Sequence, residues 1–239
     1  MINSLEILEW DSNFFGYEVA RISASSLPVE SLKAIVEEAK KKNIRLLYIF
    51  TDPADIVSKE TAIANGGKLV DQKITFYTKI DASKLLPVDE HIVQFGGDYP
   101  SEKLIDLSLQ SGIYSRYKID KNFVNREFER MYLAWIENSV NKKIADHIFV
   151  YLEDGKELGF VTLKARNNYG QIGLIAVDEG SRGKAIGKKL IAAVADQLYK
   201  KNISDLDVAT QIDNEDACNF YKRTGFIGIK TENIYHIWL

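Results

Sequence analysis

The chain has 239 residues, of which 46% are hydrophobic and 27% are charged, as in an ordinary globular protein. Its 31 basic and 34 acidic residues give a net charge of −3, which excludes a chain-wide positive field that would attract nucleic acid. The single cysteine, Cys218, excludes an internal disulfide framework, and no stretch approaches the roughly 20 apolar residues that span a membrane. The first residues also lack the basic and apolar segments of a secretory leader, so we expect a soluble cytoplasmic protein without nucleic-acid or membrane partners.

The first ninety residues have the pattern of a small αβ domain. Pro28 suits the first turn of a helix, and apolar residues then recur on one face until a run of lysines. Alternating or continuous apolar segments on either side favour strands. The predicted elements are a strand over 17–23, a helix over 28–42, a strand over 45–50, a helix over 54–65 and a strand over 73–79.

A linker is predicted over residues 81–100, where two prolines and two glycines interrupt any regular pattern. We place a domain boundary near residue 90. Residues 1–90 then form a smaller N-terminal αβ domain, and residues 91–239 form the larger domain.

The larger domain is predicted to begin with helices and to continue as strands. The turn Glu153-Asp154-Gly155-Lys156 is a strong hairpin signal between the first two of these strands. The predicted elements are helices over 101–112 and 122–141, strands over 147–152, 159–164 and 170–177, a helix from the 182–187 loop, a strand over 205–210, a helix over 214–223, and short strands over 226–229 and 235–239.

The loop between the 170–177 strand and the next helix is the most informative stretch of the chain. Small residues stand at 183, 185 and 187, and cations stand at 182, 184 and 188. Glycine costs roughly 0.5–1 kcal/mol relative to alanine inside a helix, so its use at a helix start suggests that a ligand approaches the backbone. Free N–H groups at a helix N-terminus bind phosphates. Close packing of the helix on a strand is the alternative explanation for one of these glycines.

Several motifs in order resemble the GNAT superfamily of acyl-CoA-dependent N-acetyltransferases. They are a strand that ends in Ala176-Val177, the loop Arg182-x-x-Ala185-x-Gly187, a strand that ends in Thr210-Gln211, and the segment Asn214-x-x-Ala217-x-x-x-Tyr221-x-x-x-Gly225-Phe226. The resemblance implies an α/β (α+β) protein with the GNAT acyl-CoA N-acyltransferase fold: a mixed, mostly antiparallel sheet flanked by helices, beside the smaller N-terminal domain. That domain is then interpreted as a degenerate half of the same fold. Ala185 replaces a glycine of the family signature, and alanine does not adopt a positive φ cheaply.

The resemblance also implies where acetyl-CoA binds. Its diphosphate is expected on the backbone amides of the loop, and its pantetheine arm along a strand that splays away from its neighbour. A backbone N–H near Ala176 or Val177 is then expected to polarise the thioester carbonyl. The implied cofactor-binding residues are Ile175, Ala176, Val177, Arg182, Gly183, Lys184, Ala185, Ile186, Gly187, Lys188 and Asn214.

Tyr221 occupies the position where the superfamily places a general acid for the departing thiolate. The alternative is a core aromatic residue, because Phe220 and Tyr221 are adjacent and one of them must face inward. Asn214 is expected to contact pantetheine or to cap its helix, and these uses are compatible.

Short blocks over most of the chain resemble the dTDP-fucosamine acetyltransferases of the superfamily, among them Ser115-Arg116-Tyr117 and Trp135-Ile-Glu-Asn138. This resemblance implies N-acetylation of a nucleotide-linked amino-deoxy sugar for cell-surface polysaccharide synthesis, with Arg116 on the acceptor's diphosphate. Arg116 is equally interpreted as an ordinary surface arginine. Phe128 and Trp135 fit helical periodicity and are expected in the core.

The three histidines, His91, His147 and His236, are isolated, so we predict no metal site and no histidine-based nucleophile. The general base stays unassigned, and a homodimer stays open. Two other functions also stay open: acetylation of a different amine (an amino acid, a polyamine, an antibiotic or a protein terminus), and a non-catalytic acyl-CoA-binding module.

Overall fold

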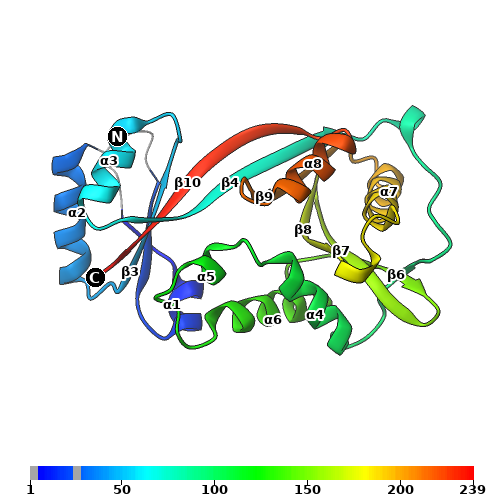
Figure 1. The fold of residues 1–239 in the computed structure, drawn as a ribbon, viewed down its shortest axis with the longest axis horizontal. Helices are drawn as coiled ribbons and strands as arrows, with labels where there is room; N and C mark the ends of the chain where they lie inside the picture. Colours follow the sequence, from blue (N-terminus) through cyan, green and yellow to red (C-terminus); the bar gives the residue numbers. More distant parts are fainter. Residues whose placement is uncertain (1–4, 24–27) are drawn as a thin grey trace. The chain divides into compact units, whose positions relative to one another are not determined.

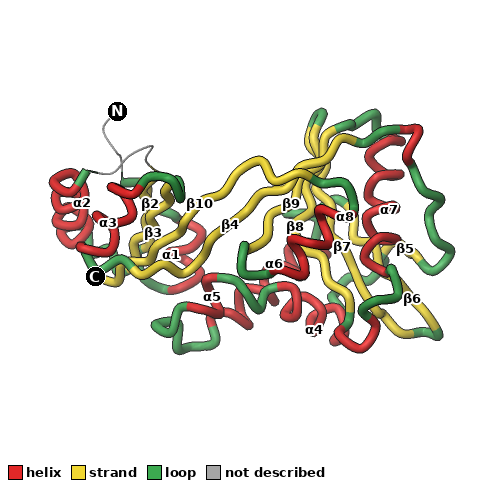
Figure 2. Tube along the Cα trace, turned by 45° about the horizontal axis from the view of Figure 1, so that its top comes forward, coloured by secondary structure: helices red, strands yellow, loops and turns green. Residues whose placement is uncertain are grey.

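The computed structural model describes residues 5–23 and 28–239 (Figure 1). The chain forms two compact units, and Figure 2 marks their helices and strands. Unit 1 holds the residues up to Ile74 together with Gln211–Asp213 and Lys230–Leu239; unit 2 holds Thr75–Thr210 and Asn214–Ile229. The strands β4 (Lys68–Lys79) and β10 (Ile227–Trp238) contribute residues to both units, so the units do not follow a single division near residue 90.

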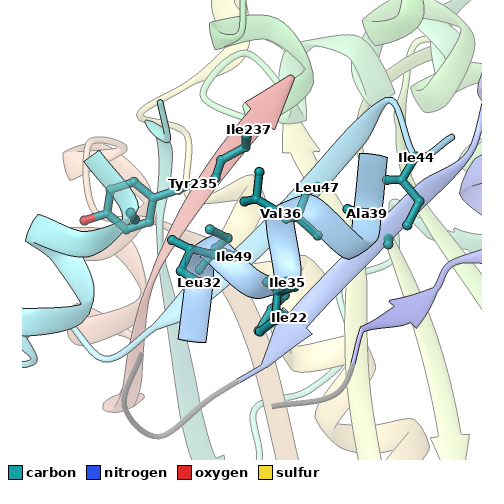
Figure 3. Close-up of a cluster of buried hydrophobic side chains, with 12 residues drawn as sticks. Ile22, Leu32, Ile35, Val36, Ala39, Ile44, Leu47, Ile49, Tyr235 and Ile237 are labelled. Atoms are coloured by element: carbon teal, nitrogen blue, oxygen red, sulfur yellow. The ribbon is translucent and has the colours of Figure 1, made fainter. Parts of the chain in front are cut away.

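Unit 1 is a small sheet with two helices on one face. Its other elements are β1 (Glu6–Ile7), α1 (Glu9–Phe15), β2 (Val19–Ser23), α2 (Val29–Lys41), β3 (Leu46–Thr51) and α3 (Ile56–Ala64). The strand order is β1-β2-β3-β10-β4, with β2 and β3 parallel and the pairs β1–β2 and β3–β10 antiparallel. The apolar stripe of α2 packs on Ile22, Leu47 and Ile49 of the sheet, as Figure 3 shows. Pro28 stands at the N-cap of α2, one position before the first turn.

Unit 2 holds the remaining elements. They are η1 (Ala82–Lys84), β5 (Ile92–Gln94), α4 (Glu102–Ser111), α5 (Arg116–Ile119), α6 (Glu127–Val140), β6 (His147–Glu153), β7 (Lys156–Arg166), β8 (Tyr169–Val177), η2 (Glu179–Ser181), α7 (Ile186–Lys200), β9 (Asp205–Gln211) and α8 (Glu215–Arg223). The strand order is β9-β8-β7-β6-β5. Only the β8–β9 pair among these is parallel. Helices α7 and α4 pack on these strands and lie on opposite sides of them (Figure 1).

The predicted fold class is confirmed: the sheet is mixed, mostly antiparallel and flanked by helices. The predicted hairpin after Glu153 is also present, and Asp154 and Gly155 both have positive φ, as a tight two-residue turn requires. Three local predictions were wrong. Strand β5 lies inside the predicted linker, where it pairs with β6; the last two short strands are one strand, β10; and the helices α1 and α5 were not predicted.

The series β2, α2, β3, α3 and β4 repeats the series β8, α7, β9, α8 and β10. In each series a strand is followed by a helix, a second strand parallel to the first, a second helix and a third strand. The turns after the first helices match, because Asn43 and Asn202 both have φ of 56°. The N–H of Ile44 then donates to the carbonyl of Ala39 at 3.0 Å, and the N–H of Ile203 donates to the carbonyl of Leu198 at 2.9 Å. The second helices match as well, since a side chain caps each one, Asp55 in α3 and Asn214 in α8. Gly66 and Gly225, both with positive φ, follow the ends of these helices.

The two copies differ at two points. Strand β2 pairs with β3 along its whole length, from Val19 to Ser23, whereas β8 leaves β9 part of the way along. Ala62, fully buried in α3, stands at the position that Tyr221 occupies in α8.

Candidate active site

A β-bulge bends strand β8 in the middle of unit 2. Two residues of β8, Gly173 and Leu174, lie opposite the single residue Thr162 of β7, because the register passes from Val161–Ile175 to Leu163–Ile172. The Thr162 hydroxyl replaces the missing ladder partner and accepts a hydrogen bond from Leu174 N–H at 2.8 Å. A bulge of this kind bends and twists its strand.

The bulge coincides with the point where β8 parts from β9. Pairing of these two parallel strands starts at Tyr169–Asp205 and ends at Ile172–Val208, directly before the bulge. The rest of β8, Gly173 to Val177, continues its pairing with β7 but runs apart from β9. A wedge therefore opens between the carboxyl ends of the two strands, as the resemblance implied.

The backbone of β8 presents hydrogen-bonding groups to this wedge. The N–H groups of Leu174 and Asp178 point toward β7, to Thr162 and to Leu158 at 2.9 Å. Peptide groups of alternate residues point to opposite sides of a strand, so those of Ile175 and Val177 face the wedge and that of Ala176 faces β7. Of the three predicted strand residues, Ile175 and Val177 are thus the ones able to pair with a ligand in the wedge.

The glycine loop follows the wedge directly. The turn η2 leads into Arg182, and Gly183 and Ala185 then adopt φ of +82° and +59°. Ala185 is the N-cap of α7 and provides no side-chain cap, and the first intrahelical bond runs from Lys189 N–H to Ala185. The amides of the first helical residues, from Ile186 to Lys188, precede this bond and have no partner within the helix, and the positive end of the helix dipole lies behind them.

The left-handed conformation of Ala185 leads to a prediction about stability. A non-glycine residue with positive φ destabilises the folded state by about 1–2 kcal/mol. Glycine avoids this strain, and the greater entropy of its unfolded chain destabilises the folded state by less than about 1 kcal/mol. The Ala185→Gly variant should therefore raise the free energy of unfolding by up to about 1 kcal/mol, measured by urea denaturation. The control Ala195→Gly, in the middle of α7, should lower it by about 1 kcal/mol. Equal losses in both variants would contradict the prediction.

The three small residues of the loop have different roles. A Cβ at Gly183 would meet nothing within 4 Å, so its positive φ is what requires glycine. A Cβ at Gly187 would lie 3.0 Å from the Phe220 ring, so this glycine permits close packing of α7 on α8. Close packing, the alternative interpretation, thus holds for Gly187, although its partner is a helix and not a strand.

The loop cations lie at the surface. Arg182, Lys184 and Lys188 are exposed, and the Arg182 Nε donates to the carbonyl of Val177 at 3.3 Å. Arg182 therefore connects the end of β8 to the loop. The neighbouring Lys189 instead forms an ion pair with Asp89 at 3.0 Å.

Tyr221 faces inward, with 3% of its surface exposed. Its ring packs against Phe76, Phe220 and Phe226, at centroid distances of 5.3 to 5.5 Å. Burial raises the pKa of the Tyr221 hydroxyl well above its usual value, so the group stays protonated at neutral and alkaline pH. Asn214 caps α8, because its Oδ1 accepts from Ala217 N–H at 3.1 Å.

Arg116 lies at the start of α5 and is half-buried, unlike an ordinary surface arginine. Its Nη2 donates to the Tyr117 hydroxyl at 2.7 Å, and its guanidinium lies 4.6 Å from the centre of that ring. Tyr117 in turn packs on Trp135. Phe128 is buried, as predicted, and Trp135 is half-buried.

A cavity of about 380 Å³ lies elsewhere in unit 2, between the segment after β5 and the end of α6. None of the predicted site residues lines it. In the described part of the chain, no group of three histidine, cysteine or acidic side chains is placed to hold a metal. No helix among the described residues has the length and hydropathy to cross a membrane.

Three features of the site were missed in the sequence. The first is the β-bulge: Gly173 within a strand pattern is a recognised bulge signal, so the bulge could have been located. The ion pair between Lys103 and Asp178, and the one between Asp89 and Lys189, join residues far apart in the chain. No local pattern predicts such pairs.

Comparison with known proteins gives consistent matches. The sequence model of the Acetyltransferase (GNAT) family matches residues 112–226. The spore coat polysaccharide biosynthesis protein SpsD of Bacillus subtilis is 28% identical over 138 residues, 58% of this chain and 47% of SpsD, so the chain spans about half the length of that relative. N-alpha-acetyltransferase 30 of Saccharomyces cerevisiae is 30% identical over 136 residues, 57% of this chain and 72% of the yeast protein.

Two solved structures share the fold at low sequence identity. A functionally unknown conserved protein of Staphylococcus epidermidis has a TM-score of 0.64 at 14% identity, over 92% of this chain and 84% of that one. A tandem GNAT protein from the clavulanic acid biosynthesis pathway has a TM-score of 0.56 at 15% identity, over 92% of this chain and 75% of that one.

Proposed function

Because the chain belongs to the GNAT family of acetyltransferases, we propose that it transfers an acetyl group from acetyl-CoA directly to the amine of a small acceptor. The observation that carries this proposal is the wedge between β8 and β9. It exposes backbone hydrogen-bonding groups of one strand and leads straight into an uncapped helix start. An extended amide chain attached to a diphosphate fits these two features together.

The cofactor's parts are assigned to the residues around the wedge. The pantetheine arm pairs with the backbone of Ile175 and Val177, and the diphosphate lies on the amides from Gly183 to Lys188. Arg182, Lys184 and Lys188 supply positive charge around the diphosphate. Asn214 caps α8 through its Oδ1. The cap does not use its side-chain nitrogen, which we propose contacts pantetheine.

The chemistry is a direct attack on the thioester. The neutral amine of the acceptor attacks the carbonyl carbon, and an N–H of the wedge, from Val177 or Ile175, stabilises the negative charge on the carbonyl oxygen. One such donor contributes roughly 3 kcal/mol to the transition state. The Tyr221 hydroxyl donates to the departing sulfur, whose charge develops as the bond to the acetyl carbon breaks. The proton lost by the amine passes to solvent, and solvent returns a proton to the Tyr221 oxygen, so that coenzyme A leaves as the thiol and the enzyme regains its starting state.

The acceptor we propose is a nucleotide-linked amino-deoxy sugar. Two observations support it: the similarity to SpsD, a spore coat polysaccharide biosynthesis protein, and a half-buried arginine, Arg116, held on an aromatic ring. Arg116 is proposed to contact the acceptor's diphosphate. A second candidate is the α-amine of a peptide, which the similarity to N-alpha-acetyltransferase 30 favours.

An acceptor panel tests both candidates. Release of coenzyme A is measured with acetyl-CoA and equal concentrations of a dTDP-4-amino-4,6-dideoxy sugar, short peptides with a free N-terminus, and a polyamine. The sugar should give the highest kcat/KM. A higher value with the peptides would replace the sugar by the second candidate, and the absence of acetyl-CoA binding would overturn the proposal as a whole.

The repeat in unit 1 leads to a further prediction about stoichiometry. Among the described residues of unit 1, β2 stays paired with β3 from Val19 to Ser23, so no wedge opens there, and Ala62 stands at the position of Tyr221. Isothermal titration should therefore give one acetyl-CoA per chain. A stoichiometry of two would contradict the assignment of the site to unit 2 alone.

A further inference from the structure

An ion-pair network holds the end of β8, where the wedge meets the loop. The Lys103 ammonium, in the first turn of α4, donates to the carboxylates of Asp178 and Asp106. Asp178 directly follows Val177. Its N–H donates to the carbonyl of Leu158, and its carbonyl accepts from the N–H of Ser181. The Lys103 side chain is 39% exposed and that of Asp178 is 20% exposed, so water screens this pair only partly.

Helix α4 is itself fixed at this point. Its N-cap Ser101 accepts from Leu104 N–H at 3.0 Å and donates to the carboxylate of Glu157 on β7. Asp106 also accepts from Gln110 at 3.0 Å. Lys103 therefore connects the start of the loop to a helix that is anchored on the sheet.

A second network holds the other end of the loop. Lys189, in the first turn of α7, pairs with Asp89 at 3.0 Å and donates to the Tyr151 hydroxyl at 3.2 Å. Asp89 also accepts from the backbone and the ring of His91, and that ring stacks on Tyr151. Lys189, followed by these His91 contacts, lowers the pKa of Asp89 to about 2. The pair therefore persists across the physiological pH range.

The segment between these two networks, residues 179–188, is the diphosphate loop. Its residues from Arg182 to Ala185 are exposed, and two of them hold positive φ. Ordering one backbone residue costs roughly 1–2 kcal/mol, so a loop that is ordered before binding spares the ligand that cost.

We propose that Lys103 and Asp89 are positioning residues, which fix the two ends of the diphosphate loop in the conformation that binds coenzyme A. The inference rests on the proposed function. Neither residue belongs to the loop itself: Lys103 acts through Asp178, and Asp89 acts through Lys189.

Lys103 and Asp89 carry opposite charges, so their variants distinguish an effect on the conformation of the loop from an effect of net charge near it. Loss of Lys103 removes a positive charge near the loop, and loss of Asp89 removes a negative one. If charge alone mattered, Lys103→Met would weaken diphosphate binding and Asp89→Asn would strengthen it. If positioning matters, both variants weaken it.

The test compares two acetyl donors. Acetyl-CoA carries the diphosphate, whereas S-acetylpantetheine ends before it. In each variant, KM for acetyl-CoA should rise about tenfold, a factor that corresponds to about 1.4 kcal/mol, while kcat and the kcat/KM for S-acetylpantetheine stay at wild-type values. The matched control is Asp196→Asn, which breaks the Asp196–Lys200 pair in the last turns of α7 and should change neither donor.

Each other outcome is decisive. An unchanged KM for acetyl-CoA, tighter binding by Asp89→Asn, or equal losses with both donors would overturn the inference. Failure of the wild-type protein to bind acetyl-CoA would instead overturn the proposed function.

Discussion

The Tyr221→Phe variant is expected to bind acetyl-CoA as tightly as the wild-type protein and to lose about 10²- to 10³-fold in kcat. The substitution removes only the hydroxyl, so the aromatic packing on Phe76 and Phe226 is retained. Without a donor, the thiolate departs with its full negative charge. Steady-state kinetics, together with calorimetric titration of acetyl-CoA, measure the two effects separately.

Tyr235→Phe is the matched control, because Tyr235 is a fully buried tyrosine of unit 1 and lies outside the proposed site. It should keep wild-type turnover. The direction of the pKa shift adds a second readout: since burial raises the pKa of Tyr221, protonation of this group should not limit kcat between pH 7 and its usual pKa of 10.0. If Tyr221→Phe keeps wild-type turnover, Tyr221 is a core residue and not the acid.

Gly112→Ala should lower the free energy of unfolding by about 3 kcal/mol, the upper end of the usual cost of overpacking. A Cβ at this position would lie 2.0 Å from the Tyr132 ring, far inside van der Waals contact. That ring cannot move easily, because Phe128 and Trp135 pack on it with centroids at 5.0 Å. Since domains are stable by only about 5–15 kcal/mol, chemical denaturation should detect the loss readily.

Gly96→Ala is the control for this prediction, because a Cβ at Gly96 would meet nothing within 4 Å. Its free energy of unfolding should change by less than about 0.5 kcal/mol. In a Tyr132→Leu background the clash disappears, so Gly112→Ala should cost less there, and the double-mutant cycle should show coupling of about 1–3 kcal/mol. Additive effects would mean that the steric argument is wrong.

Most helices and strands could be predicted because each follows from a local pattern. The stripe of α2, the hairpin at Asp154-Gly155 and the glycine after α8 are properties of consecutive residues. Strand β5 and helix α5 were missed because they are short and are defined by pairing or by neighbours instead of by periodicity. The union of the last two strands into β10 depends on its neighbours in the sheet, β3 and β4, which lie far away in the chain.

The candidate site was inferred from local patterns of the same kind. The loop from Arg182 to Lys188 and the positions of Asn214 and Tyr221 come from residue types in a fixed order. The sequence did not reveal that Ala176 points its peptide group toward β7, because strand parity depends on the bulge opposite Thr162. It also did not reveal that Ala185 bears the strain of a positive φ, which the rest of the fold must offset.

The amino-acid sequence by itself determined the class of fold, the glycine loop and the family resemblance, because these depend on spacing along one segment. The tertiary structure decided which peptide groups face the wedge, which glycine permits helix packing, and which lysine of the loop is exposed. Lys188 and Lys189 are neighbours in the chain, yet one is exposed and the other is bound to Asp89. Only the folding of distant segments onto each other brings such partners within bonding distance.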